Sequence, residues 1–96
     1  MQSIALQTDK PLDPEKFFPW IQEISRELGP DILRLKGILS FTNDPDRYVV
    51  QGVHMIIEGD HQRAWRADEK RESKLVFIGR NLPEDVLSSG FAACAA

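Results

Sequence analysis

The apolar positions in the first third of the chain follow two different periods. Residues 3–8 alternate apolar and polar side chains, a pattern typical of a short β-strand. Between residues 14 and 28, apolar side chains recur every three or four positions and predict an amphipathic helix. Asp13 suits the N-cap of this helix, and Gly29-Pro30 suits its end. Pro19 removes a backbone donor inside the helix, so we expect its first turn to be kinked or separate.

The next apolar run, ILRLKGILSF at residues 32–41, predicts a strand with two cations near its centre. Alternation puts Leu33, Leu35, Gly37, Leu39 and Phe41 on one face, and Ile32, Arg34, Lys36, Ile38 and Ser40 on the other. If helices cover the leucine face, Arg34 and Lys36 point away from the helices. The two cations then lie on a sheet face that is open to water or to a partner.

The following residues predict two more strands and their connections. Residues 42–47 are rich in turn formers and should join two antiparallel strands. Residues 48–58 are mostly apolar on both faces and predict one long central strand, which residues 59–61 end. Residues 62–73 are highly charged and predict a loop or a ragged edge strand. Residues 74–79 are rich in β-branched and aromatic side chains and predict another strand.

The last element is predicted to be a helix. Asn81 and Glu84 have the spacing of a capping box, and Gly90 weakens the helix by up to ~1 kcal/mol relative to alanine. One helical face carries Val86, Leu87, Phe91 and Cys94. The predicted order is β-α-β-β-β-α. It indicates an α+β two-layer sandwich, in which two helices cover one face of a mainly antiparallel four-stranded sheet.

Composition narrows the class of protein. The 96 residues form one domain, 1–96, and 42% hydrophobic and 28% charged residues are typical of a globular chain. The net charge of −3 argues against nucleic-acid binding, and no apolar run approaches the ~20 residues that span a membrane. The N-terminal residues lack a secretory-signal pattern, and one cysteine cannot form an internal disulfide. We therefore expect a cytoplasmic protein in which Cys94 is a buried, inert thiol.

The outward face of the predicted sheet has two interpretations. It is either a solvated face, on which the stems of Arg34 and Lys36 lie along the sheet, or a docking surface. For docking, Ile38, Val50 and Ile56 would keep the face partly apolar, and large apolar patches seldom stay bare on a monomer. Gly37 and Gly52 would allow close approach of a ligand or backbone, although strand glycines also mark simple bulges.

The two histidines are candidates for a metal site. His54 lies within the predicted central strand, where a hydrogen-bonded structural histidine is the commoner outcome. Glu58, Asp60 and His61 could bind a metal ion at a turn through carboxylate oxygens and one imidazole. Turns are rich in such residues in any case, so both interpretations stay open.

Arginines surround the single tryptophan of the charged segment. Trp65 either caps the edge of the core or anchors a protein interface, where tryptophan and arginine are favoured. Arg71, Arg80 and the strand cations could together meet an anion, since the planar guanidinium group suits that task. The alternative is a solvated loop, because acidic residues balance these cations.

An ordered set of segments resembles one known family. The segments are PLDPEKFFPWIQEI at 11–24, RLKGILSF at 34–41, YVVQGVHMIIEG at 48–59, Trp65, and ESKLVFIGRNLPEDVLSSGFAAC at 72–94. Together they resemble the C-terminal domain of CobW-type GTPases, the cobalamin-synthesis and metal-chaperone group. The resemblance covers nearly the whole chain.

The resemblance implies an accessory domain and not an enzyme. In the family, GTP hydrolysis and metal delivery rest on a P-loop domain with a G-x-x-x-x-G-K-[ST] loop and a Cys-x-Cys-Cys motif, and this chain contains neither. GTP, magnesium and zinc or cobalt therefore belong to the parent protein, and this domain has no cofactor of its own. The residues that match the domain's own motif are Arg34, Lys36, Gly37, His54, Trp65, Arg71 and Arg80.

We therefore predict a non-catalytic interaction or regulatory domain. It would dock the P-loop GTPase domain of its parent, another copy of itself, or a metalloprotein client, through the face with Arg34 and Lys36. One alternative is a small metal-binding module that uses His54, His61 and nearby carboxylates. Another is a stand-alone domain that binds a small ligand. The chain starts directly on a strand, as a domain cut from a longer protein would.

Overall fold

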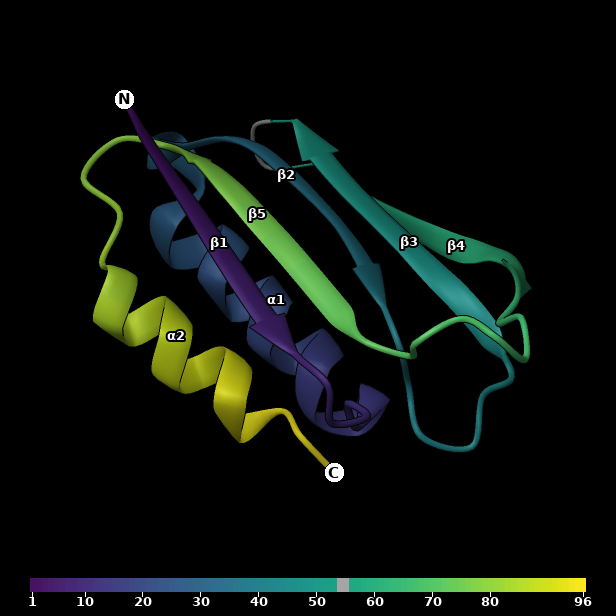
Figure 1. Cartoon of the computed structure of the whole chain (residues 1–96). Coiled ribbons are helices and arrows are strands. Elements are labelled where there is room, and N and C mark those ends of the chain that lie inside the picture. Colours follow the sequence, from purple (N-terminus) through teal and green to yellow (C-terminus); the bar gives the residue numbers. More distant parts are fainter. Residues whose placement is uncertain (54–55) are drawn as a thin grey trace.

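The fold is a five-stranded antiparallel sheet with two helices on one of its faces (Figure 1). The computed structural model describes residues 1–53 and 56–96. The elements are β1 (Gln2–Thr8), α1 (Pro14–Leu28), the 3₁₀ turn η1 (Gly29–Asp31), β2 (Ile32–Leu39), β3 (Asp46–Val53), β4 (Ile56–Ala64), β5 (Ser73–Gly79) and α2 (Glu84–Ala93). The strands lie in the order β1-β5-β2-β3-β4. This confirms the predicted α+β class.

The number of strands differs from the prediction. The segment 48–58, predicted as one long strand, is divided between β3 and β4, which pair as antiparallel neighbours. Residues 59–61, predicted to end that strand, lie within β4, and β4 continues through residues 62–64 of the predicted loop. No glycine-rich or proline-rich break separates the apolar residues of 48–58, so local composition did not reveal the division. The observed order is β-α-β-β-β-β-α.

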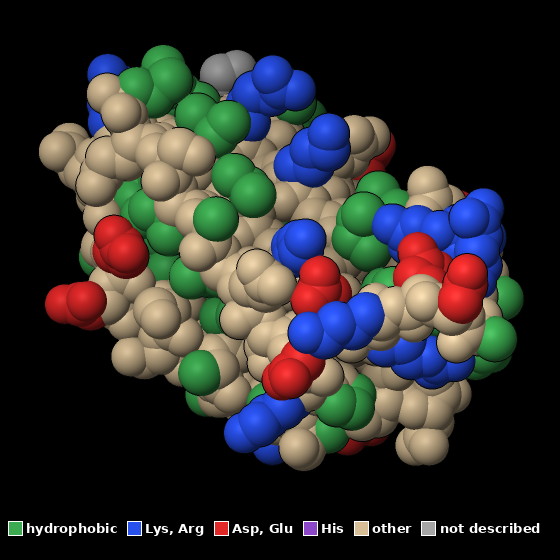
Figure 2. Space-filling model, in the orientation of Figure 1, with side chains coloured by type: hydrophobic (Ala, Val, Ile, Leu, Met, Phe, Trp, Pro, Cys, Tyr) green, Lys and Arg blue, Asp and Glu red, His purple; other side chains and the backbone are tan. Residues whose placement is uncertain are grey.

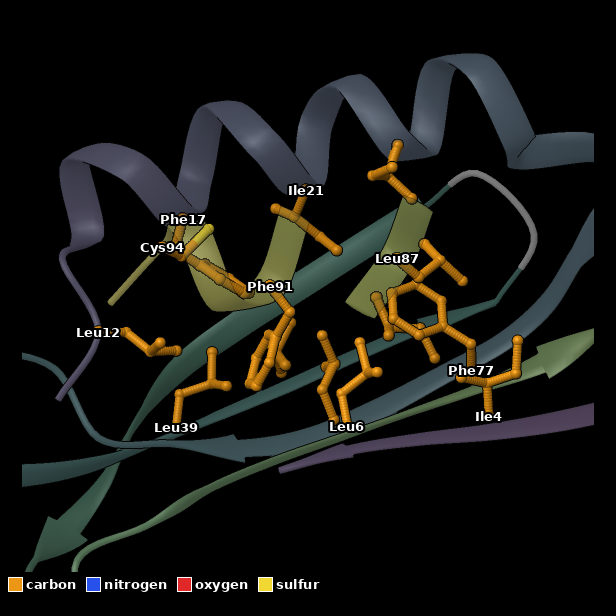
Figure 3. Packing of buried hydrophobic residues seen from close by; sticks show 14 of the residues in the cluster. Ile4, Leu6, Leu12, Phe17, Ile21, Leu39, Phe77, Leu87, Phe91 and Cys94 are labelled. Carbon is orange, nitrogen blue, oxygen red and sulfur yellow. The ribbon is translucent and has the colours of Figure 1, made fainter. Parts of the chain in front are cut away.

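The hydrophobic core lies between the helical layer and the covered face of the sheet (Figure 3). Phe17, Ile21 and Ile24 of α1 point into it, as the helical spacing predicted. Leu87 and Phe91 of α2 join them. The sheet contributes Ile4, Leu6, Ile32, Leu35, Leu39, Val50, Leu75 and Phe77. Burial of these side chains removes their apolar area from water, which is the main favourable contribution to folding.

Helix α1 is continuous through Pro19. Its N-terminus is capped as predicted, because the Asp13 carboxylate accepts a hydrogen bond of 2.9 Å from the backbone N–H of Glu15. Of the two expectations for the first turn, a separate turn is wrong, since one helix spans Pro14–Leu28, and the kink stays a prediction. Phe17 and Ile21 on either side of Pro19 are both buried, so core packing holds the helix together across the missing hydrogen bond.

Helix α2 begins without the predicted capping box. Its N-cap is Pro83, and no side chain caps the first turn. Asn81 instead adopts a left-handed backbone conformation with φ of 54° in the connection before the helix, a region that asparagine tolerates. The predicted apolar face also needs one correction, because Val86 is 56% exposed. Among the described helices, none combines the length and the hydrophobicity needed to cross a membrane.

A β-bulge shifts the faces at the start of β2. The register against β5 changes between Ile32 and Arg34. Ile32 is therefore buried in the core while Leu33 is only partly buried, the reverse of their predicted faces. Within β2 beyond the bulge the predicted alternation holds, so Leu35 faces the core while Arg34 and Lys36 are exposed. Ser40, which follows β2 and was predicted to face outward, is buried.

Candidate interaction surface

The face of the sheet away from the helices carries no helix of this chain within the described residues (Figure 1). Figure 2 looks onto this open face, where blue cationic side chains lie over the sheet with green apolar patches between them. Arg34 and Lys36 are both exposed there, as the alternation predicted. The open face is therefore available for contact with another molecule.

Strand register arranges the side chains of the open face in three rows that run from the β1 edge to the β4 edge. The rows are Ser3, Ile78, Arg34, Val53 and Ile56; Ala5, Val76, Lys36, Gln51 and Glu58; and Gln7, Lys74, Ile38, Val49 and Asp60. Neighbours in a row lie on adjacent strands and project to the same side. The charges and the apolar groups of the face consequently have fixed positions relative to one another.

Charges of opposite sign occupy different strands of the open face. We call Arg34, Lys36 and Lys74, on β2 and β5, the cationic stripe, and Glu58 and Asp60, on β4, the acidic stripe. Neither Arg34 nor Lys36 forms an ion pair within residues 1–53 and 56–96. Lys74 lies 3.2 Å from Glu72, and this hydrogen bond lowers the pKa of the Glu72 carboxyl.

Apolar side chains lie between and beside the two stripes. Val53 is 55% exposed and Ile56 is 69% exposed, and both lie on the open face. The prediction that Val50 belongs to this face is wrong, because Val50 is only 2% exposed and belongs to the core. Val50 pairs with Gly37, and both point toward the covered side of the sheet.

Gly37 and Gly52 serve packing inside the fold. A Cβ atom on Gly37 would lie 2.6 Å from the carbonyl oxygen of Lys74 and 2.8 Å from a methyl carbon of Leu75. A Cβ atom on Gly52 would lie 3.1 Å from the carbonyl oxygen of Ile56. Both glycines are buried on the covered side, so their predicted role in admitting a ligand to the open face is not supported by their position.

The candidate metal ligands do not come together. Glu58, Asp60 and His61 lie within β4 and not in a turn, so alternation sends the two carboxylates to the open face and His61 to the other side. His61 Nε2 lies 2.8 Å from the Asp44 carboxylate, and its ring packs edge-on against Tyr48. Among the described residues, no group of three or more His, Cys, Asp or Glu side chains could hold a metal ion. His54 lies outside the described residues.

Asp44 is an ionised partner for His61. A hydrogen bond from the backbone N–H of Asp46 lowers the pKa of the Asp44 carboxyl, and His61 adds to this effect. The pair connects the β2–β3 loop to the edge strand β4. Its geometry is that of a structural contact, because the imidazole is directed at a carboxylate of the same chain.

Trp65 lies in a network of arginines at one end of the sheet. It is absent from the core cluster, and the guanidinium carbon of Arg47 lies 5.4 Å from the centroid of its ring. The Glu69 carboxylate accepts two hydrogen bonds of 2.9 Å from Arg63 and one of 3.3 Å from Arg47. The hydrogen bond from Arg63, followed by the one from the backbone N–H of Arg66 and by the positive charges of Arg63 and Arg47, lowers the pKa of Glu69 from its ordinary 4.5 to about 2. Trp65 therefore packs on Arg47 of the neighbouring strand β3, and its predicted role as a cap on the core is not seen.

Arg71 and Arg80 do not form one anion site with the strand cations. Arg71 precedes β5 and donates a 3.5 Å hydrogen bond to the carbonyl oxygen of Asp44. Arg80 follows β5 and lies 3.9 Å from the Asp31 carboxylate. The two arginines thus flank opposite ends of a strand that spans roughly 20 Å. Their predicted meeting at a shared anion is wrong.

An apolar hollow lies on the helical side of the sheet, next to β3 and β4. It has a volume of about 280 Å³ and is lined by Phe18, Ile21, Tyr48 and Ile57 among others. Gln22 and Ser25 of α1 also line it. Cys94, the single cysteine of the chain, also lies on the helical side of the sheet. It is buried as predicted, and burial raises the pKa of its thiol.

Sequence reasoning missed part of the open face. Lys74, Val76 and Ile78 alternate with buried Leu75 and Phe77 along β5, and this alternation was visible in the sequence. Placing them beside Arg34 and Lys36 required the β2–β5 register, which joins strands separated by β3 and β4 in the chain. The acidic stripe was missed because Glu58 and Asp60 were assigned to a turn.

Comparisons with known proteins find one family whose profile matches nearly the whole chain. The sequence profile of the family described as "Cobalamin synthesis protein cobW C-terminal domain" matches residues 1–95. The chain is 35% identical over 92 residues to the zinc chaperone YjiA of Escherichia coli, covering 96% of this chain and 29% of that protein. It is 39% identical over 59 residues to the zinc chaperone CobW of Pseudomonas aeruginosa, covering 62% of this chain and 16% of that protein.

The crystal structure of the Zn(II)-bound YjiA GTPase from E. coli has the same fold over this region. The TM-score is 0.94 at 34% identity, and the match covers 99% of this chain and 30% of the YjiA chain. The chain therefore spans less than a third of the length of these relatives.

Proposed function

Because this chain belongs to the cobW C-terminal domain family, we propose that it is a non-catalytic docking domain that works beside a P-loop GTPase domain in a metal-delivery protein. The open face of the sheet would be the docking surface. The family membership confirms the resemblance that the sequence predicted. The chain itself contains no P-loop motif, so nucleotide chemistry would belong to the partner domain.

The observation that carries this proposal is the open face itself. It presents exposed apolar side chains, Val53 and Ile56, beside two cations that form no ion pair within the described part of the chain. Interfaces between domains combine apolar contact with charged groups in this way. A purely solvated face needs neither Val53 nor Ile56 at such high exposure.

The named relatives supply the context. YjiA and CobW are described as zinc chaperones, and the solved YjiA structure is that of a Zn(II)-bound GTPase. This chain matches less than a third of YjiA, which leaves ample length in such a protein for a GTPase domain. We therefore assign GTP, magnesium and the delivered zinc or cobalt to that domain, with the metal as cargo.

A binding measurement with two charge reversals tests the docking role. The partner is the separately produced P-loop domain of the parent protein, and the readout is the Kd from calorimetry. Arg34→Glu replaces a cation of the docking face with a carboxylate and should raise the Kd about tenfold or more, because reversing a charge at an interface removes a favourable contact and adds a repulsive one. Arg26→Glu makes the same change of charge on the exposed side of α1, in the opposite layer, and should leave the Kd within about twofold.

Two outcomes would contradict the docking role. Wild-type chain that shows no affinity for the P-loop domain removes the proposal. Equal losses from Arg34→Glu and Arg26→Glu would show that only total charge matters. The same calorimeter tests the metal-binding alternative, because micromolar binding of zinc or cobalt that is lost in His61→Ala would favour a metal module.

A further inference from the structure

The open face carries its charges in an order that a partner can recognise. Going from β5 to β4, the cationic stripe comes first, apolar side chains follow, and the acidic stripe comes last. Ile38 and Val49 separate Lys74 from Asp60 in one row of the face. The face therefore has a direction, which a uniform basic patch would lack.

The two stripes are held too far apart to neutralise each other. Lys36 and Glu58 belong to the same row, with Gln51 between them on β3. Two interstrand spacings separate their backbones by roughly 10 Å. Neither side chain forms an ion pair within the described residues, although their charges are opposite. Both charges are consequently free of ion pairs with the described residues and can meet groups of a partner.

The apolar residues between the stripes would strengthen these contacts. A partner that covers Ile38, Val49, Val53 and Ile56 excludes water from the surface around the charged side chains. Attraction between opposite charges is several times stronger once water is excluded, and a misplaced like charge costs correspondingly more. One docking orientation is then favoured over the reversed one.

Building on the proposed docking function, we infer that the two stripes fix the orientation of the GTPase domain. Its docking surface presents carboxylates to Arg34, Lys36 and Lys74, and a lysine or arginine to Glu58 and Asp60. Complementary potentials of this kind give specificity and register more than raw affinity. A polyanion such as nucleic acid fits less well, because the acidic stripe repels it.

A second copy of the chain is the rival occupant. A two-fold axis along β3 would place Lys36 of each copy over Glu58 of the other, so the face is partly self-complementary. The same operation places Ile38 of one copy over Asp60 of the other, so Asp60 faces an apolar side chain and no cation. The full pattern therefore favours a different protein surface over a second copy.

Exchanging the two charges of one row tests the inference. The double variant Lys36→Glu/Glu58→Lys keeps the net charge and the composition of the face but reverses the order of the stripes. If the stripes fix the orientation, this swap raises the Kd for the P-loop domain at least tenfold. The control swap Glu23→Arg/Arg26→Glu, on the exposed side of α1, should change the Kd by less than about twofold. Circular dichroism and thermal unfolding verify that both variants fold.

The possible results separate the inference from the docking function. If the stripe-swap variant binds the P-loop domain with the wild-type Kd while Arg34→Glu still raises the Kd, the docking function stands and the orientation role is overturned. Wild-type chain without any affinity for the P-loop domain overturns both. Sedimentation that shows a dimer of the chain, kept by the stripe swap but lost in Lys36→Glu alone, assigns the face to a second copy and overturns the inference. A dimer would survive the stripe swap because both copies carry the exchanged charges, so residue 36 of one copy still meets an opposite charge at residue 58 of the other. The P-loop domain is unchanged and would lose this complementarity.

Discussion

At the scale of single residues, Gly90 shows how a locally unfavourable choice is explained by a distant contact. Glycine costs about 1 kcal/mol relative to alanine within a helix, and the sequence predicted this weakness in α2. In the structure, a Cβ atom at position 90 would clash with Nε1 of Trp20. The Trp20 ring is held by contacts with Phe17, Phe77 and Phe91, so it cannot move aside freely. The missing side chain makes room for the indole.

Gly90→Ala should therefore lower the free energy of unfolding despite the better helix propensity. Overpacking typically costs 1–3 kcal/mol, against a gain of about 1 kcal/mol from propensity, so we expect a net loss of up to about 2 kcal/mol. Ser89→Ala, at the exposed neighbouring position, should be neutral or slightly stabilising. Urea unfolding of the three proteins measures the difference. A Gly90→Ala variant at least as stable as Ser89→Ala would show that the indole does not need this space.

At the scale of elements, the connection between β4 and β5 depends on one carboxylate. Glu69 accepts hydrogen bonds from Arg63 and Arg47 and from the backbone N–H of Arg66, so one side chain holds the loop to two neighbouring strands. Trp65 adds a contact with Arg47 and a backbone hydrogen bond of 2.9 Å to the carbonyl oxygen of Pro45. The sequence showed a charged loop here, but it did not show that a single acid organises it.

This contact predicts a specific dependence of stability on pH. The folded state lowers the pKa of Glu69 from 4.5 to about 2, so folding favours the ionised carboxylate. Its contribution to stability is complete above about pH 4.5 and disappears as the pH falls through the folded pKa near 2. Glu69→Gln should be less stable than wild type at pH 6, and this difference should shrink toward zero near pH 2. Urea unfolding at several pH values measures it.

A second variant verifies the origin of that effect. Arg63→Gln removes the strongest partner of Glu69 and should lose stability over the same range of pH. The double variant should lose little more than either single variant, because both substitutions remove one shared contact. A stability difference that stays constant from pH 6 to pH 2 would assign the loop to another interaction.

At the scale of the whole molecule, total charge and local charge have different consequences. The net charge of −3 argued against a nucleic-acid partner, yet the centre of the open face is cationic. Helices α1 and α2 lie on the other side of the sheet (Figure 1), so the charges of the two layers face different surroundings. A partner would meet the local field of the sheet before it senses the small net charge.

The rate of docking should consequently depend on salt. The Debye length falls from about 10 Å at 0.1 M salt to about 3 Å at 1 M, which screens the stripes from a distant partner. We expect the association rate with the P-loop domain to fall several-fold or more between these conditions, while the dissociation rate changes less. Arg34→Glu should flatten the dependence in stopped-flow measurements. An association rate that is equal at low and high salt would show that the charges do not guide encounter.

The sequence by itself determined the class of the fold, both helices and most strands. It also determined the outward direction of Arg34 and Lys36 and the family to which the chain belongs. These features depend on local periodicity, on the capping residue Asp13 and on the order of segments along the chain, which can all be recognised without knowing which distant segments are in contact. Asp13 and the α1 core positions Phe17, Ile21 and Ile24 illustrate how directly such patterns translate into structure.

Only the tertiary structure decided which side chains share the open face. The β3–β4 pairing, the bulge at the start of β2 and the pairing of β5 with both β1 and β2 depend on contacts between distant segments. A shift of one residue in strand register exchanges the two faces, as it did for Ile32 and Leu33, and no local pattern records it. For the same reason Glu58 and Asp60, expected as metal ligands in a turn, lie in the edge strand β4 on the open face, at one edge of the proposed docking surface.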